Sequence, residues 1–284
     1  MINKKYKDRL FCLLFGNEEY KDNILSLYNA LCNTSYTNTD DIQIYTIEDV
    51  IYIKMKNDVS VLLDSFLYLW EQQSTFNPNM PIRGLLYFGK MYDKYITENH
   101  LNIYGKTLIK LPTPKYTVLY NGMDEQPAFM QLRLSDSFIN PDSSGDFEWT
   151  ANMINLNDGK NDDLLDKCQP LKEYMILINE IRKNSVSMGL EDAVDTAVTY
   201  CIEHNVLKSF LLKHRAEVLD VCITEYNEKS FVDGIREEGR KEGRKEGQNL
   251  LATVVLRLRN GETPEQILAS GVDAKTIELA ETIK

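Results

Sequence analysis

Residues 58–73, DVSVLLDSFLYLWEQQ, constrain the fold more than any other stretch of this 284-residue chain. Two apolar runs flank the turn-prone pair Asp64-Ser65, and this arrangement predicts a β-hairpin with a two-residue loop. Such a loop sets the register, because each residue of the first run then faces a fixed residue of the second. In this register Asp58 is predicted to face Glu71 at the open end of the hairpin.

Both faces of the predicted hairpin are apolar. Because side chains alternate between the two faces of a strand, each run contributes to both. One face holds, besides the two acids, Ser60, Leu62, Leu67 and Leu69, and the other holds Val59, Val61, Tyr68 and Trp70. A ribbon of this kind must be covered on both sides, so the hairpin is predicted to be the central strand pair of a sheet.

Two carboxylates that face each other across a hairpin lie with their Cβ atoms about 5 Å apart. At an effective dielectric near 20, two negative charges at about 5 Å repel by roughly 3 kcal/mol. A divalent cation between Asp58 and Glu71 would turn this repulsion into a net attraction, since hard cations such as Mg²⁺ bind carboxylate and carbonyl oxygens. The pair therefore indicates metal-assisted cleavage of a phosphodiester.

Two other interpretations of the same residues remain. Lys56 would face Gln73 in this register and would neutralise the acids in an ordinary ion cluster. A register shifted by one residue would instead turn the two acids to different faces.

The acid pair and several further motifs resemble one known family. Asp58, followed by Glu71-x-Gln73 on the second strand, is similar to the D…ExK signature of the PD-(D/E)XK nuclease superfamily. The chain over about residues 5–247 resembles one branch of it, the Rpn family of recombination-promoting nucleases and transposase-like proteins. The matching segments are DRLFCLLFGN (8–17), LYNAL (27–31), NDVS (57–60), EQQST (71–75), NPNMP (77–81), LPTP (111–114) and the Glu-Gly-Arg repeats near residue 240.

The chain departs from the superfamily pattern at two positions. Asn57 stands where proline is usual, and Gln73 stands where lysine is usual. Glutamine at this position resembles the residue that is usual in the Rpn branch. It changes the chemistry, because an amide cannot accept a proton as a base and would only orient the attacking water.

The resemblance implies an α/β fold with a restriction-endonuclease-like core of PD-(D/E)XK type, a mixed sheet flanked by helices, and a helical C-terminal extension. The implied activity is that of a metal-dependent DNA endonuclease whose DNA breakage promotes recombination. Asp58, Glu71 and the main-chain carbonyl of Gln72 would hold Mg²⁺, Mn²⁺ or Ca²⁺, and Gln73 would orient water.

Three further residues are weaker candidates. Asp8 matches the acidic residue of the family's first helix, although an acid in a first turn also simply favours the helix dipole. Arg83, one turn into a later helix, would point toward a DNA phosphate or would pair with an acid as a surface arginine. Lys56 belongs to a local basic track beside the proposed site, and Lys106, Lys110 and Lys115 follow it; scattered lysines of this kind also occur on any solvated face.

The net charge of −11 counts against broad electrostatic binding to DNA and leaves room only for a local track. Five scattered cysteines without a CxxC motif suggest a reducing compartment. The N-terminal residues lack an apolar core, and no run approaches 18 apolar residues. We therefore expect a cytoplasmic protein that has DNA as its partner and does not bind a membrane.

Periodicity places the remaining elements of the core. Helices are expected over 6–15 and 18–32, and a strand over 42–56. A helix that begins near Pro81 and runs to Ile96 is expected to turn inward Ile82, Leu85, Leu86, Gly89, Tyr92 and Ile96, with Gly89 closest to the sheet. A strand over 115–120 and further strands within 129–156 follow, and from residue 162 the pattern is helical, most clearly over 190–202.

The C-terminal part divides by composition. We expect a nuclease-like core over 1–156, a helical extension over 157–233, a linker rich in Gly, Glu, Arg and Lys over 234–248, and a small helical module over 249–284. The module holds too little core to be independent. We therefore expect it to dock on the main domain or to form a homo-oligomer. A non-catalytic protein that uses the nuclease fold for oligomerisation or partner binding is the alternative function.

Overall fold

The structure is a computed structural model, and it describes residues 6–45, 59–142, 144–220, 247 and 250–283. These fall into two compact units, within Asn3–Tyr226 and within Asn227–Lys284. The predictions for Asp58, Lys56, most of the strand over 42–56 and nearly all of the linker over 234–248 lie outside the described residues. Each unit is described by itself.

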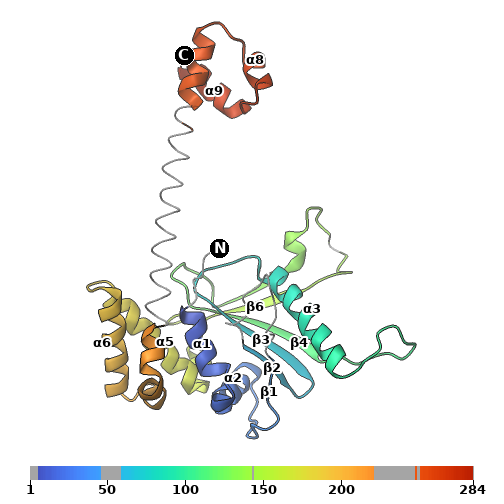
Figure 1. Cartoon of the computed structure of the whole chain (residues 1–284), viewed down its shortest axis with the longest axis vertical. Helices are drawn as coiled ribbons and strands as arrows, with labels where there is room; N and C mark the ends of the chain where they lie inside the picture. Colours follow the sequence, from blue (N-terminus) through green and yellow to red (C-terminus); the bar gives the residue numbers. More distant parts are fainter. Residues whose placement is uncertain (1–5, 46–58, 143, 221–246, 248–249, 284) are drawn as a thin grey trace. The chain divides into compact units, whose positions relative to one another are not determined.

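The larger unit is built on a six-stranded mixed sheet flanked by helices (Figure 1). The order is β1-β2-β3-β4-β6-β5, with β3, β4 and β6 parallel and the other neighbours antiparallel. The strands are β1 (Gln43–Ile44), β2 (Val59–Leu63), β3 (Phe66–Gln73), β4 (Thr113–Tyr120), β5 (Phe129–Arg133) and β6 (Thr150–Asn155). The molecule is therefore an α/β protein, as predicted.

The predicted hairpin is confirmed as β2 and β3. Leu63 pairs with Phe66 and Val59 pairs with Trp70, which is the expected register up to the first described residue of β2. Asp64 and Ser65 form the loop with φ of 50° and 62°. Two consecutive residues with positive φ are characteristic of a type I′ turn, which matches the twist of the strands and fixes the register. Both faces are covered, because the side chains of β2 and β3 divide between two hydrophobic clusters.

The crossover from β3 to β4 is made by α3 (Met80–Glu98), which has Pro81 in its first turn and packs against β4, β5 and β6. This confirms the predicted helix and the predicted strand that follows it, which is β4 and runs parallel to β3. The predicted inward face is wrong in part, since of its members Tyr92 packs against the cluster beneath α3. Ile82, Leu86 and Gly89 are exposed, and the buried residues are Met80, Pro81, Gly84, Tyr87, Phe88 and Met91.

The reason for this error is the aromatic layer beneath α3. A Cβ placed on Gly84 would lie 2.5 Å from two ring atoms of Tyr116 and 2.9 Å from Nε1 of Trp149. A Cβ placed on Gly89 would meet no atom of the described residues within 4 Å outside the adjoining turns of its own helix. The helix thus turns Gly84 and its aromatic neighbours onto the sheet, and the aliphatic residues used for the prediction lie on the outer side.

The other face of the sheet is covered by the N-terminal and the later helices, which form one cluster with β2 and β3. These elements are α1 (Tyr6–Phe15), η1 (Glu18–Tyr20), α2 (Lys21–Cys32), α4 (Asp162–Lys167), α5 (Gln169–Asn184), α6 (Leu190–Glu203) and a helix over 208–220. The expected periodicity of 190–202 is confirmed, because Ala193, Val194, Ala197, Val198 and Cys201 are buried. A short 3-10 turn, η2 (Leu134–Ser137), follows β5.

The smaller unit contains a helix over 250–259, α8 (Pro264–Ala269) and α9 (Ala274–Ile283). Thr263 and Gln266 form a capping box, with Pro264 at the first helical position. Its core is a small cluster of Val254, Leu258, Ile267, Ile277 and Ala280.

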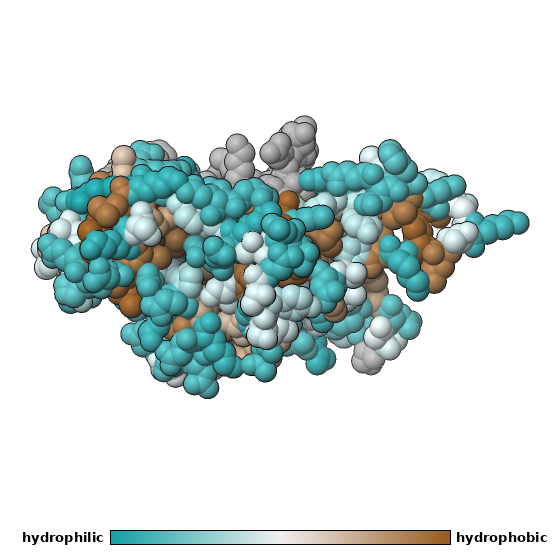
Figure 2. Space-filling model, turned by 90° about the horizontal axis from the view of Figure 1, so that it is seen from below, coloured by the Kyte–Doolittle hydropathy of each residue, from teal (hydrophilic) through white to brown (hydrophobic). Residues whose placement is uncertain are grey.

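Among the described residues, every helix is too short or too polar to cross a membrane. The face seen in Figure 2 is mostly hydrophilic, with apolar patches between the polar residues. Several large apolar side chains are exposed, including Leu86 on α3 and a group on the loop that follows it.

Candidate active site

Glu71 is a buried carboxylate near the carboxyl end of β3, and its side chain is only 1% exposed. The hydroxyl of Tyr116, on the neighbouring strand β4, donates a hydrogen bond of 2.5 Å to Oε2. The amide of Gln73, two residues further along β3, donates one of 2.9 Å to Oε1. Burial of a charge without such donors would cost several kcal/mol, so these contacts keep Glu71 compatible with an ionised form.

Arg83, in the first turn of α3, forms an ion pair with Oε1 of Glu71. Its guanidinium is also held by the hydroxyl of Tyr87, at 3.0 Å from Nη2 and 3.3 Å from Nε. The side chain of Arg83 is 31% exposed, so the pair lies between the core and the surface. Glu71 therefore has a cationic partner supplied by the chain itself, and this matches the interpretation of Arg83 as an arginine paired with an acid.

Glu71 is the only carboxylate of the predicted metal site among the described residues, and side chains of the chain itself occupy it. Both oxygens of Glu71 already accept from Tyr116, Gln73 and Arg83. A metal at this carboxylate would have to replace the guanidinium of Arg83, because two cations at one carboxylate repel each other. Within the described parts of the chain, no three His, Cys, Asp or Glu residues cluster where they could hold a metal ion.

The other predicted site residues are distributed as follows. Asp58 and Lys56 lie outside the described residues, so their position relative to Glu71 stays a prediction. Asp8 belongs to α1, but its side chain is outside the described set. Gln73 lies beside Glu71 as expected. The side chain of Gln72 lies on the other face of the sheet, where its amide donates to Oδ1 of Asn121 at 2.7 Å.

Gln72 and Asn121 begin a buried polar network beyond the carboxyl ends of the parallel strands. Both side chains are completely buried. The amide of Asn121 donates a hydrogen bond of 3.3 Å to the hydroxyl of Tyr174 on α5. Nη2 of Arg182, also on α5, donates to the main-chain oxygen of Asn121. Among the described residues, Oε1 of Gln72 has no hydrogen-bond partner. The cost of leaving such a buried acceptor unpaired is about 1–3 kcal/mol.

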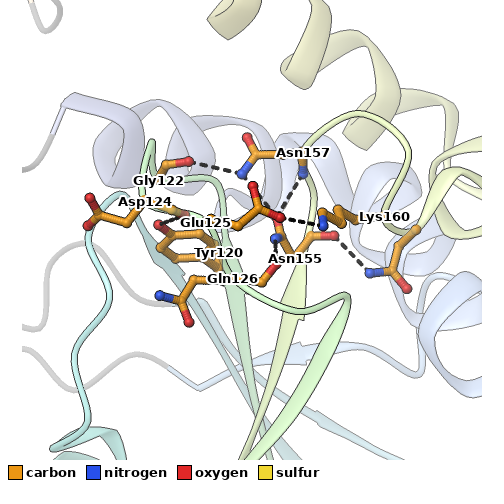
Figure 3. A network of polar contacts seen from close by, with 9 residues as sticks. Tyr120, Gly122, Asp124, Glu125, Gln126, Asn155, Asn157 and Lys160 are labelled. Carbon is orange, nitrogen blue, oxygen red and sulfur yellow. Dashed lines mark hydrogen bonds and ion pairs between the residues drawn. The ribbon is translucent and has the colours of Figure 1, made fainter.

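Figure 3 shows the neighbouring part of the network, at the ends of β4 and β6. Asn155 donates to the main chain of Gln126 at 2.8 Å, and Asn157 donates to that of Gly122 at 2.9 Å. Burial raises the pKa of Tyr120, whose hydroxyl donates to the main chain of Asp124. These amides close the loop over 121–128 onto the sheet, so we interpret them as structural.

Comparisons with family models, with curated proteins and with solved structures found no match. The interpretation of the site therefore depends on the geometry and on the sequence motifs.

Sequence reasoning missed Tyr116, Tyr87 and the asparagine network. Tyr116 lies in a predicted strand, but its contact with Glu71 depends on the register between two parallel strands joined by a helix. A signal was present for the asparagines, because Asn121, Asn155 and Asn157 stand at or directly after strand ends. Polar residues at the carboxyl ends of parallel strands gather at one edge of a sheet.

Proposed function

We propose that this protein is a metal-dependent DNA endonuclease of the PD-(D/E)XK type, with its active site at the open end of the β2–β3 hairpin. The observation that carries the proposal is the buried, ordered carboxylate of Glu71 on a central strand, with Gln73 beside it. The register of the hairpin, which agrees with prediction as far as Val59, supports the pairing of Asp58 with Glu71. The six-stranded mixed sheet is compatible with such a core.

Hydrolysis of a phosphodiester adds a water oxygen to phosphorus and leaves the released sugar oxygen with a proton. Mg²⁺ or Mn²⁺ would be required, with Asp58 supplying the second carboxylate beside Glu71 and the carbonyl of Gln72 a further oxygen. The amide of Gln73 would orient the attacking water, since it cannot act as a base. Asp8 would assist. Arg83, released from Glu71 when a metal takes its place, would contact the DNA backbone together with Lys56.

The test is nicking of supercoiled plasmid DNA by the purified full chain in Mg²⁺ or Mn²⁺. We expect nicking by the wild type and its loss in Asp58→Ala and Glu71→Gln. Glu191→Gln, an exposed acid on α6, serves as the matched control and should keep full activity. Equal nicking by the wild type, Asp58→Ala and Glu71→Gln would show that the activity comes from a contaminant or another site.

A second function is favoured by one specific observation, the pairing of Glu71 with Arg83. A carboxylate neutralised in this way needs no metal, as expected for a non-catalytic protein that keeps the fold for oligomerisation or partner binding. The same plasmid-nicking experiment distinguishes the nuclease function from the non-catalytic one. A folded wild type that nicks DNA in neither metal would support the non-catalytic function.

A further inference from the structure

The loop over 99–112, between α3 and β4, exposes an unusual set of apolar side chains. We call it the α3–β4 arm. Tyr104 is 92% exposed and Leu108 is 79% exposed, and Ile103 and Leu111 are also exposed. Figure 1 shows the arm extending beyond the end of α3, away from the sheet, and Figure 2 shows apolar and hydrophilic residues beside each other at the same end. Exposed apolar groups of this kind mark interaction sites more often than isolated ones do.

The arm is also basic in an acidic chain. No aspartate or glutamate occurs from Asn99 to Met123, although the chain holds 43 acidic residues among 284. Lys106 and Lys110 are both exposed. Among the described residues, neither lysine is in an ion pair. The arm therefore presents positive charge without neighbouring negative charge from its own segment.

The arm is anchored at both ends. The amide of Leu101 donates to the carbonyl of Ile96 at 2.9 Å, which closes the end of α3. The hydroxyl of Tyr92 donates to the carbonyl of Pro112 at 2.8 Å, and the amide of Thr113 donates to that of Ser65 at 2.9 Å. At the tip of the arm, the main-chain amide of Gly105 donates to the carbonyl of Asn102 at 3.2 Å and closes a turn. Anchoring of this kind lowers the ordering cost of binding.

Helix α3 connects the arm to the candidate active site. Arg83 pairs with Glu71 in the first turn of α3, and the arm begins directly after the last residue, Glu98. At 1.5 Å per residue, the helix from Arg83 to Glu98 is about 22 Å long. One turn of B-form DNA is about 34 Å. A duplex at Glu71 that lies along α3 would therefore reach the arm within one helical turn.

From these observations we propose that the α3–β4 arm is a second DNA contact of this protein. Lys106 and Lys110 bind phosphates of double-stranded DNA within one helical turn of the cleaved bond, and Tyr104 and Leu108 pack against the sugars and base edges of a groove. The inference rests on the proposed nuclease function, because it uses the placement of the duplex at Glu71. DNA is favoured over a protein partner because the exposed apolar residues alternate with lysines and lack acids.

The test is binding of a fluorescein-labelled duplex of about 30 base pairs to the full chain, measured by anisotropy in EDTA over a series of KCl concentrations. The arm variant is Lys106→Glu/Lys110→Glu. The matched control is Lys167→Glu/Lys208→Glu, which makes the same charge change at exposed lysines on α4 and on the helix over 208–220. Both control positions lie on helices of the other face of the sheet.

We expect the arm variant to bind at least about tenfold more weakly than the control variant at low salt. The plot of log K against log[KCl] should become shallower by about 2 in slope, since each lost phosphate contact removes about 0.9 from the magnitude of the slope. Tyr104→Ala/Leu108→Ala should also weaken binding but leave the slope unchanged. Equal weakening in the arm and control variants, or absence of duplex binding by the wild type, would overturn the proposal.

Two outcomes separate this proposal from others. If sedimentation shows that the arm variant changes the mass of the protein while its DNA affinity matches the control, the arm binds a second copy of the chain and the DNA proposal fails. If duplex binding depends on the arm but the wild type does not nick plasmid in Mg²⁺ or Mn²⁺, the arm contact stands and the nuclease function fails.

Discussion

At Glu71, the desolvation of a buried carboxylate is compensated by three side chains from three elements. Tyr116 and Gln73 supply hydrogen bonds, and Arg83 supplies the positive charge. Removal of one partner of a buried ion pair is costly mainly because the remaining charge loses its compensation. The stability of the protein and the availability of Glu71 to a metal are therefore linked through Arg83.

Arg83→Gln tests this link. In EDTA the variant should lose about 2 kcal/mol of unfolding free energy, less than for a fully buried pair because Arg83 is partly exposed. If a metal binds at Glu71, Mn²⁺ should raise the Tm of the variant more than that of the wild type, because the competing guanidinium is gone. Denaturant titration and thermal unfolding with and without Mn²⁺ measure both effects.

The control for this experiment is a double-mutant cycle. Glu71→Gln/Arg83→Gln should recover part of the stability lost by Arg83→Gln alone, since no charge is left unpaired. Strictly additive single and double variants would show that the two side chains do not stabilise each other in solution.

Residues whose contacts are local could be predicted, and those that depend on distant strands could not. The register of β2 and β3 follows from a two-residue loop, so facing pairs could be assigned from the sequence. Gln73 lies beside Glu71 because residues two apart on one strand share a face. The contacts of Tyr116 and Arg83 with Glu71 depend on how α3 and β4 return to the sheet, and no spacing in the sequence encodes this directly.

At the scale of elements, α3 shows why periodicity finds a helix more readily than its buried face. Two stripes on this helix are apolar, one mainly aliphatic and one of aromatic residues, methionine and glycine. The choice between them is made by the rings of Tyr116 and Trp149, which accept a glycine and no larger residue. The helix was predicted correctly and its orientation was not.

Gly84→Ala and Gly89→Ala form a matched pair on this helix. The new methyl group at Gly84 would meet the ring of Tyr116 at 2.5 Å, so we expect a loss of about 1–3 kcal/mol from overpacking. At the exposed Gly89 a new methyl group would meet no described residue within 4 Å beyond the adjoining helix backbone, so alanine should stabilise the helix by up to about 1 kcal/mol. Denaturant unfolding measures both.

The Gly84 variant also bears on the site. Displacement of Tyr116 would disturb its hydrogen bond to Glu71, so any nicking activity should fall in Gly84→Ala and be kept in Gly89→Ala. Stability changes of equal sign in the two variants would contradict the orientation of α3 described here.

At the scale of the whole molecule, the described part of the small unit, residues 250–283, has a small core. Five of these described side chains are buried in it, while Leu250, Leu256, Leu268 and Leu279 are exposed by roughly half. Units of this size gain stability from association when their own core is small. We therefore keep the prediction that the C-terminal tail forms a homo-oligomer.

Truncation of the chain at Phe231 should lower its mass in sedimentation velocity to that of a monomer, and Leu256→Glu/Leu279→Glu in the full chain should do the same. Each glutamate would place a charge in the apolar contact, whereas Lys275→Glu, an exposed change on α9, should leave the oligomer intact. If the truncated and full chains both sediment as monomers or as the same oligomer, the tail is not the self-association surface. The exposed leucines would then have to contact something other than a second copy of the chain.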